Sequence, residues 1–134
     1  MKAVLDTNVV LSGLLSGEGA CGRILDLFFE GHVQLCIDDR ILREYDAVLP
    51  RPLFKILPEK VTRTLDFIRL NGERIEAPPL VVAMPDPSDL PFLEVATAAD
   101  AILVTGNIKH FPRHARAGVT VVSPREFIDL LRRA

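Results

Sequence analysis

The chain begins MKAVLDTN (residues 1–8), and this stretch predicts the fold. Its apolar run, Ala3 to Leu5, does not alternate with polar residues, and it ends directly on Asp6. Short apolar runs of this kind are typical of strands buried on both faces of a parallel sheet. In an open α/β sheet, ligands bind beyond the carboxyl ends of the strands. We therefore expect Asp6 to lie at a binding site; the alternative is that it only caps the helix that starts near Asn8.

The composition is that of a globular protein, and the length predicts a single domain over residues 1–134. The formal net charge of −2 excludes a chain that coats nucleic acid through its bulk charge. No apolar run approaches the roughly 18 residues of a membrane span, and the N-terminus does not resemble a signal peptide. Cys21 and Cys36 lack zinc-site spacing, so we expect buried thiols in a reducing cytoplasm.

Further apolar runs predict more strands, with helical spacing between them. The pattern predicts an α/β fold, a three-layer α/β/α sandwich around a parallel sheet of four to five strands. The expected strands after the first are Val33–Ile37, Ala101–Val104 and Val119–Val122, with a possible short one at Arg74–Glu76. The expected helices are Thr7–Ser16, Cys21–Glu30, Asp39–Leu49, Pro58–Leu70, a helix from about Asp89 to Ala99, and a terminal helix opened by a capping box at Ser123 and Glu126.

Two acids on the predicted helices are candidates for the same edge of the sheet. Glu44 lies at the border of the apolar stripe of its helix; the alternative is a solvated side chain paired with Arg40. Asp89 lies on the buried side of its helix, at the open end. Glu94 points to the opposite side of that helix, and we expect it in solvent. Asp86 remains ambiguous, because Asp-Pro is common turn chemistry.

The strand at residues 101–104 adds a fourth candidate. Asn107 follows this strand and is expected near Asp6, whereas Asp100 precedes it and belongs to the far edge. A basic loop then leaves the predicted site with Lys109, Arg113 and Arg116. These cations predict a grip on phosphate groups, with a solvated loop as the alternative.

The candidate residues at this edge are three carboxylates and an amide, Asp6, Glu44, Asp89 and Asn107. Carboxylates brought together without a Lys or Arg partner repel one another, and a hard divalent cation removes that repulsion. Oxygen ligands without a His or Cys cluster indicate Mg²⁺ or Mn²⁺ and not zinc. Such a cation suits phosphodiester cleavage.

The ordered set of motifs resembles the PIN domain, and more closely the group of VapC-like toxin components of bacterial and archaeal toxin–antitoxin pairs. The motifs are VLDTN (residues 4–8), ILREY (41–45), DPSDLPFLE (86–94) and LVTGN (103–107). The resemblance covers essentially the whole chain. It implies a PIN-like fold and a metal-dependent endoribonuclease that cleaves RNA, is usually dimeric and is often silenced by a cognate antitoxin.

Residue by residue, the resemblance gives Asp6, Glu44 and Asp89 the role of metal-binding acids, and Thr7, Asn8 and Thr105 that of polar neighbours. The chain departs from the family at the fourth acidic position. Many relatives have an Asp at the place of Asn107 or three residues later, where this chain has His110. The number of metal ions and the catalytic rate are therefore open.

Two rival interpretations remain. A haloacid-dehalogenase-like phosphatase also has an Asp after its first strand, but it needs a second Asp two residues later, and this chain has Asn8 there. The other is a catalytically weak or inactive PIN-fold module that acts by binding RNA or protein. The three acids argue against it, and the missing fourth acid argues for it. The RNA target, the cleavage sequence and the antitoxin cannot be inferred from these residues.

Overall fold

The computed structural model describes residues 1–134 and contains a five-stranded sheet in which every neighbouring pair is parallel. The order along the sheet is β3-β2-β1-β4-β5, so the first strand lies in the centre. Central strands are covered on both faces, which explains why β1 is apolar throughout its buried part. The strands are β1 (Lys2–Leu5), β2 (Gln34–Ile37), β3 (Glu73–Arg74), β4 (Ile102–Val104) and β5 (Val121–Val122).

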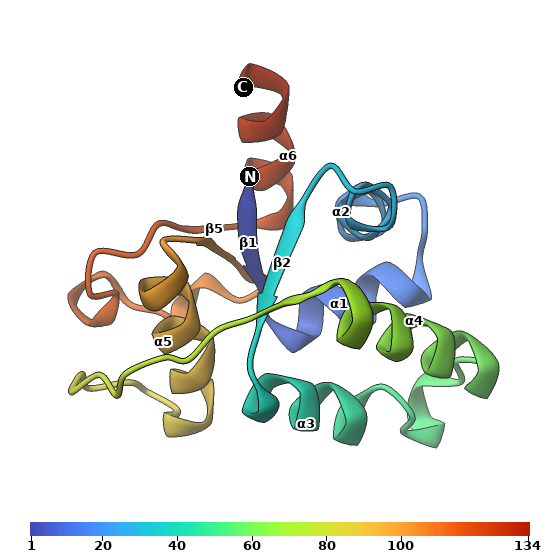
Figure 1. Cartoon of the computed structure of the whole chain (residues 1–134), viewed down its shortest axis with the longest axis horizontal. Helices are drawn as coiled ribbons and strands as arrows, with labels where there is room; N and C mark the ends of the chain where they lie inside the picture. Colours follow the sequence, from blue (N-terminus) through green and yellow to red (C-terminus); the bar gives the residue numbers. More distant parts are fainter.

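Helices cover both faces of the sheet, as the alternation of elements predicts. In Figure 1, α5 lies on one side of the strands, and α1, α2 and α4 lie on the other. Helix α5 contacts β1, β2 and β4, while α2 contacts both α1 and α6. The three-layer α/β sandwich around a parallel sheet that the sequence predicts is confirmed. The helices are α1 (Thr7–Leu15), α2 (Ala20–Phe29), α3 (Asp39–Val48), α4 (Pro58–Asn71), α5 (Leu90–Ala99) and α6 (Pro124–Arg133).

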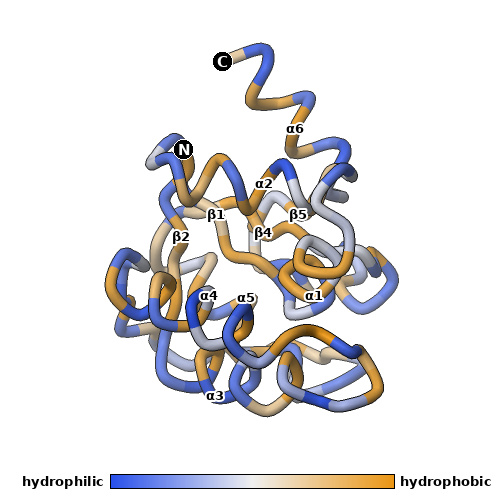
Figure 2. Tube along the Cα trace, turned by 90° about the vertical axis from the view of Figure 1, so that its right-hand side faces the viewer, coloured by the Kyte–Doolittle hydropathy of each residue, from blue (hydrophilic) through white to orange (hydrophobic).

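The hydrophobic core follows the two central strands. Figure 2 shows β1 and β4 as apolar segments in the interior, with polar stretches towards the outside. The same figure shows α6 reaching away from the rest of the molecule. This helix begins with the expected capping box, in which Ser123 and Glu126 each bind the other's backbone N–H. No helix has the length and the apolar character that crossing a membrane would require.

A long segment without regular structure follows β3. Residues 75–86 run across α5 before the chain turns into that helix, as Figure 1 shows in yellow-green. At Leu80, the backbone N–H of this segment donates a hydrogen bond to a side chain of α5. The segment therefore covers a second side of α5, which a helical wheel does not reveal.

Candidate metal centre

The register of the sheet places Asp6 beside Thr105. Leu5 and Val104 are the last pair of β1 and β4, and Asp6 and Thr105 directly follow them. The backbone N–H of Asp6 donates to the Val104 carbonyl at 2.9 Å, and that of Thr105 donates to Val122 at 3.0 Å. The Thr105 hydroxyl then donates to Asp6 Oδ2 at 2.8 Å. Two strands that are far apart in sequence thus orient one carboxylate.

Asp6 is buried, and its side chain does not cap the following helix. It occupies the residue before α1 but makes no side-chain capping bond, so capping does not explain this acid. Burial raises the pKa of Asp6, and the hydrogen bond from Thr105 opposes that shift. The carboxylate is therefore held in a place where its charge is costly.

Asn8 connects this acid to the turn after β4. Its Nδ2 lies 3.3 Å from Asp6 Oδ2, and its Oδ1 accepts a hydrogen bond from the Gly106 N–H at 2.9 Å. A Cβ at position 106 would lie 3.2 Å from Asn8 Oδ1. Such a contact is tight, and glycine avoids it. The turn can thus pass close to the residues that orient Asp6.

Glu44 faces the same edge because the next residue, Tyr45, attaches α3 to the end of β1. The Tyr45 hydroxyl is fully buried and donates to the Leu5 carbonyl at 2.5 Å. Burial raises the pKa of Tyr45 well above its usual range, and the charges of Asp6 and Glu44 add to that effect. Glu44 itself accepts a hydrogen bond from the Thr7 hydroxyl. It does not pair with Arg40, so that alternative is wrong.

Asp89 is the third acid, and one of its oxygens has no hydrogen-bond partner. It ends a short 3₁₀ turn, Pro87–Asp89, directly before α5, and is buried. Its Oδ2 is buried and accepts no hydrogen bond. Burial, followed by the negative charge of Asp6, raises the pKa of Asp89 from 3.8 to about 6. Buried polar atoms without partners are rare and are often found at functional sites.

Asp86 satisfies its own turn. Its carboxylate accepts hydrogen bonds from the Ser88 N–H at 2.9 Å and the Ser88 hydroxyl at 2.8 Å. These two bonds lower the pKa of Asp86, which is exposed. The local contacts agree with turn chemistry for this residue.

The expected position of Glu94 is wrong. This side chain is buried, whereas the helical wheel predicts it in solvent. Its Oε1 lies 2.6 Å from Arg40 Nη1, and its Oε2 accepts the Leu80 N–H at 2.7 Å. The wheel fails because the segment over α5 and Arg40 of α3 together enclose the helix face opposite the sheet.

Asn107 and His110 stand at the fourth position. The side-chain nitrogen Nδ2 of Asn107 is 2.9 Å from Nε2 of His110. The backbone N–H of Asn107 donates to the Thr105 hydroxyl at 3.0 Å. The other ring nitrogen of His110, Nδ1, lies 3.2 Å from Asp89 Oδ2. The approach of His110 to Asp89 is the feature that the sequence did not indicate. Its only signal is the spacing of three residues from Asn107.

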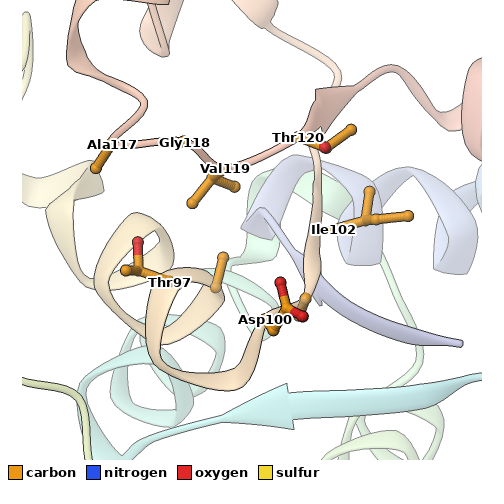
Figure 3. Close-up of a pocket in the computed structure, with 9 residues that line it drawn as sticks. Thr97, Asp100, Ile102, Ala117, Gly118, Val119 and Thr120 are labelled. Atoms are coloured by element: carbon orange, nitrogen blue, oxygen red, sulfur yellow. The ribbon is translucent and has the colours of Figure 1, made fainter.

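A separate cavity lies at the opposite edge of the sheet. It has a volume of about 190 Å³ and is lined by the end of α5, the start of β4 and the loop before β5. Figure 3 shows Asp100 there, with Thr97, Ile102 and Gly118 around the same space. Asp100 is the only acid in this lining, which agrees with its expected place at the far edge.

A known protein family matches most of this chain. The family described as "PIN domain" matches residues 2–109, which include Asp6, Glu44, Asp89 and Asn107. The chain belongs to the PIN domain family. PIN domains are generally nucleases.

The chain is also similar to individual proteins. It is 28% identical over 151 aligned residues to an uncharacterised protein of Methanocaldococcus jannaschii (MJ1680), covering 96% of this chain and 90% of the relative. The structure superposes on VapBC2 of Rickettsia felis, solved bound to a DNA fragment from its promoter. That match has a TM-score of 0.60 and 20% identity, and covers 92% of this chain and 98% of the other. It also superposes on PAE2754 of Pyrobaculum aerophilum, with a TM-score of 0.62, 15% identity, and coverage of 100% and 91%. Both structures support the PIN fold.

PIN domains generally use a divalent metal, and the chemistry of these residues fits one. Asp6 and Glu44 form no salt bridge, and Asp89 has only His110 beside it. The unpartnered Asp89 oxygen has lone pairs available to bind a cation, and hard divalent cations prefer carboxylate oxygen as a ligand. In their present positions, no three His, Cys, Asp or Glu side chains meet closely enough to hold one ion. These side chains would have to move toward one another to hold a cation together.

Proposed function

We propose that this PIN domain is an endoribonuclease that depends on Mg²⁺ or Mn²⁺ and cleaves RNA phosphodiester bonds. The observation that supports it is the buried Asp89 oxygen, which has no hydrogen-bond partner and whose carboxyl pKa is raised by burial and by Asp6. A structural role would satisfy this oxygen with a donor. A cation-binding role leaves it free.

We assign each residue of the proposed site a role that is consistent with its contacts. Asp6, Glu44 and Asp89 hold the cation, Thr105 and Asn8 orient Asp6, and Thr7 orients Glu44. A divalent cation supplies Lewis-acid activation of water and neutralises the charge on the phosphate.

Asn107, together with the basic loop, faces the substrate in this proposal. The amide of Asn107 completes the catalytic set as a neutral donor to a phosphate oxygen. Lys109 and Arg113 are exposed and form no salt bridge, so they are free to contact RNA phosphates. Arg116 is different, because its Nε donates to the Phe111 carbonyl at 2.8 Å and braces the loop.

We further propose that the enzyme acts in the cytoplasm, as the toxin of a toxin–antitoxin pair, and forms a homodimer. The support is the similarity in fold to the VapBC2 complex of Rickettsia felis. A cognate antitoxin protein is the partner that this role implies. Co-expression with the neighbouring gene product and size-exclusion chromatography of the complex would test this part.

An inactive PIN-fold module that binds RNA or protein is the second candidate. The observation in its favour is that no three potential ligands meet around one point in the structure. Such a module would bind RNA with no dependence on a divalent cation and would leave the RNA intact.

RNA cleavage by the purified protein separates the two candidates. We expect fragments in Mg²⁺ or Mn²⁺ and none in EDTA. Asp6→Asn should abolish cleavage, because it removes a buried ligand charge without changing the shape of the side chain. Asp26→Asn, on the exposed surface of α2, is the matched control and should cleave like the parent. Equal cleavage by the parent and Asp6→Asn would refute the proposed site.

A further inference from the structure

The imidazole of His110 lies at the edge of the acidic site. His110 ends a short 3₁₀ turn, Ile108–His110, and its side chain is 44% exposed, so it lies at the rim and not in the core. Its Nδ1 is 3.2 Å from Asp89 Oδ2. That oxygen makes no hydrogen bond, so the imidazole approaches it without forming an N–H···O bond.

The Nδ1 and Oδ2 atoms are close enough to share a proton or a cation. A ring nitrogen and a carboxylate oxygen both offer lone pairs, and they repel unless a proton or a cation is shared. Two ligands that bind one ion at a right angle, each about 2.1 Å from it, lie roughly 3 Å apart. The distance between Nδ1 and Oδ2 is close to this value.

Asn107 holds the other side of the ring. Its amide nitrogen Nδ2 lies 2.9 Å from His110 Nε2, and turning the amide by 180° would bring the acceptor Oδ1 to the same place. Its backbone N–H donates to the hydroxyl of Thr105, the residue that orients Asp6. A histidine that ligates a metal generally donates its second ring N–H to an acceptor, which fixes the orientation of the ring. The amide of Asn107 carries such an acceptor as well as a donor.

We propose that His110 is a metal ligand of this chain, and that its Nδ1 and the Asp89 carboxylate bind the same divalent cation. Asn107 is then a positioning residue that orients the imidazole. The site would replace the missing fourth acid by a nitrogen. This inference rests on the proposed function, because it concerns the same site.

A nitrogen ligand changes which cation the site prefers. Mg²⁺ favours sites built only from oxygen, whereas imidazole favours first-row transition ions. We therefore expect Mn²⁺ and Co²⁺ to bind more tightly than Mg²⁺. Replacing His110 by Gln should weaken Mn²⁺ binding by about tenfold or more, the lower bound seen when even an outer partner of a metal ligand is lost. The affinity for Mg²⁺ should change much less.

Pulsed electron paramagnetic resonance on the Mn²⁺-loaded full chain tests this directly. A coordinated imidazole gives a ¹⁴N modulation of the Mn²⁺ signal, which is independent of activity. We expect it in the parent and in His114→Gln, and expect it to disappear in His110→Gln. His114 is the matched control, because it is an exposed histidine of the same loop. His110→Asp should bind Mn²⁺ tightly again, without the nitrogen signal.

The outcomes separate this inference from the proposed function. Mn²⁺ bound at the site without ¹⁴N modulation would overturn the role of His110 and leave a metal site of oxygen ligands. A parent protein that binds no Mn²⁺ in calorimetry would overturn both. Modulation that persists in His110→Gln would assign the nitrogen to another residue and refute the proposal.

Discussion

Asp89 and Glu94 are two buried acids five residues apart, and their surroundings are opposite. Glu94 has an arginine at 2.6 Å on one oxygen and a backbone N–H at 2.7 Å on the other. Asp89 has an oxygen with no hydrogen bond at all. Both carboxylates lost water on folding, but only Glu94 has a close polar partner on each of its oxygens.

The difference separates an acid that serves the fold from one that we propose to be a metal ligand. Glu94 connects α5 to α3 and to the segment over α5, so its charge contributes to the fold. Asp89 lies at the carboxyl edge of the sheet, where its uncompensated charge lowers stability in the free protein and favours a cation. Burial alone does not distinguish the two acids. The partners of their oxygens do.

The largest expected effect is the loss of Glu94. Glu94→Ala removes one partner of a buried ion pair and leaves the Leu80 N–H without an acceptor. We expect the free energy of unfolding to fall by about 3 kcal/mol, the low end for buried pairs, because Arg40 remains partly exposed. Urea unfolding measures this. Glu76→Ala, at an exposed position, is the control and should change stability by less than about 0.5 kcal/mol.

Glu94→Gln tests whether the charge of Glu94 is needed for stability. A Glu94→Gln variant that is as stable as the parent would mean that its charge is not structural. Metal binding should be unchanged by either substitution, once allowance is made for the unfolded fraction.

The second prediction concerns the metal and Asp89. A cation that binds only the folded state at 100 times its Kd should raise the free energy of unfolding by about 2.7 kcal/mol. We expect this gain with Mn²⁺ in the parent and in Glu76→Gln. It should be lost in Asp6→Asn and Asp89→Asn. Thermal unfolding with Mn²⁺ and with EDTA measures it, and an equal gain in Asp89→Asn would contradict our assignment.

The third prediction is a pH dependence without metal. Because the pKa of Asp89 is raised from 3.8 to about 6, the folded chain binds this proton more tightly than the unfolded chain. Stability contributed by this group should therefore fall as pH rises from about 4 to 6, and stay low above that range. After solvent screening we expect a loss on the order of 1–2 kcal/mol.

Asp89→Asn should remove this dependence, since it has no proton to lose. In EDTA at pH 7 it should be more stable than the parent by a similar amount. Urea unfolding at several pH values in EDTA measures both effects. A variant with the parent's pH profile would show that Asp89 titrates as an ordinary surface acid.

The smallest expected effect concerns the basic side chains, which also differ in whether they have an acidic partner. Arg40 is engaged by Asp38 and Glu94, whereas Lys109 and Arg113 have no acidic partner. Each phosphate contact contributes about 0.7 to the slope of log K against log salt for a single strand. Replacing Lys109 and Arg113 by Ala should lower that slope by up to about 1.4 and leave Mn²⁺ binding intact. Fluorescence anisotropy with labelled RNA measures it, and an unchanged slope would indicate a solvated loop.

The sheet and its edge could be predicted because they depend on local patterns. The run from Ala3 to Leu5 is apolar in sequence and fully buried in the structure, and Asp6 follows it at the strand end. Parallel strands then bring Thr105 to the same edge without further information. The helix limits were predicted to within a few residues for the same reason, since caps and prolines are local signals.

Contacts made by irregular segments could not be predicted. Glu94 was misplaced because the covering segment has no periodicity that fixes its path. The approach of His110 to Asp89 depends on a short 3₁₀ turn after β4, whose direction no spacing determines. The site residues themselves were named from spacing and resemblance. Their roles in metal binding and catalysis remain predictions.

The central position of β1 has a consequence for synthesis of the protein. Its neighbour β4 follows about a hundred residues later, and the hydroxyl that orients Asp6 belongs to Thr105, 99 positions along the chain. A nascent chain on the ribosome can form α1, β2 and α3 long before it can pair β1 with β4. An incomplete product that ends before residue 105 lacks the partner that orients Asp6. The order of synthesis thus leaves Asp6 without this hydrogen bond until residue 105 has been made and β4 has paired with β1.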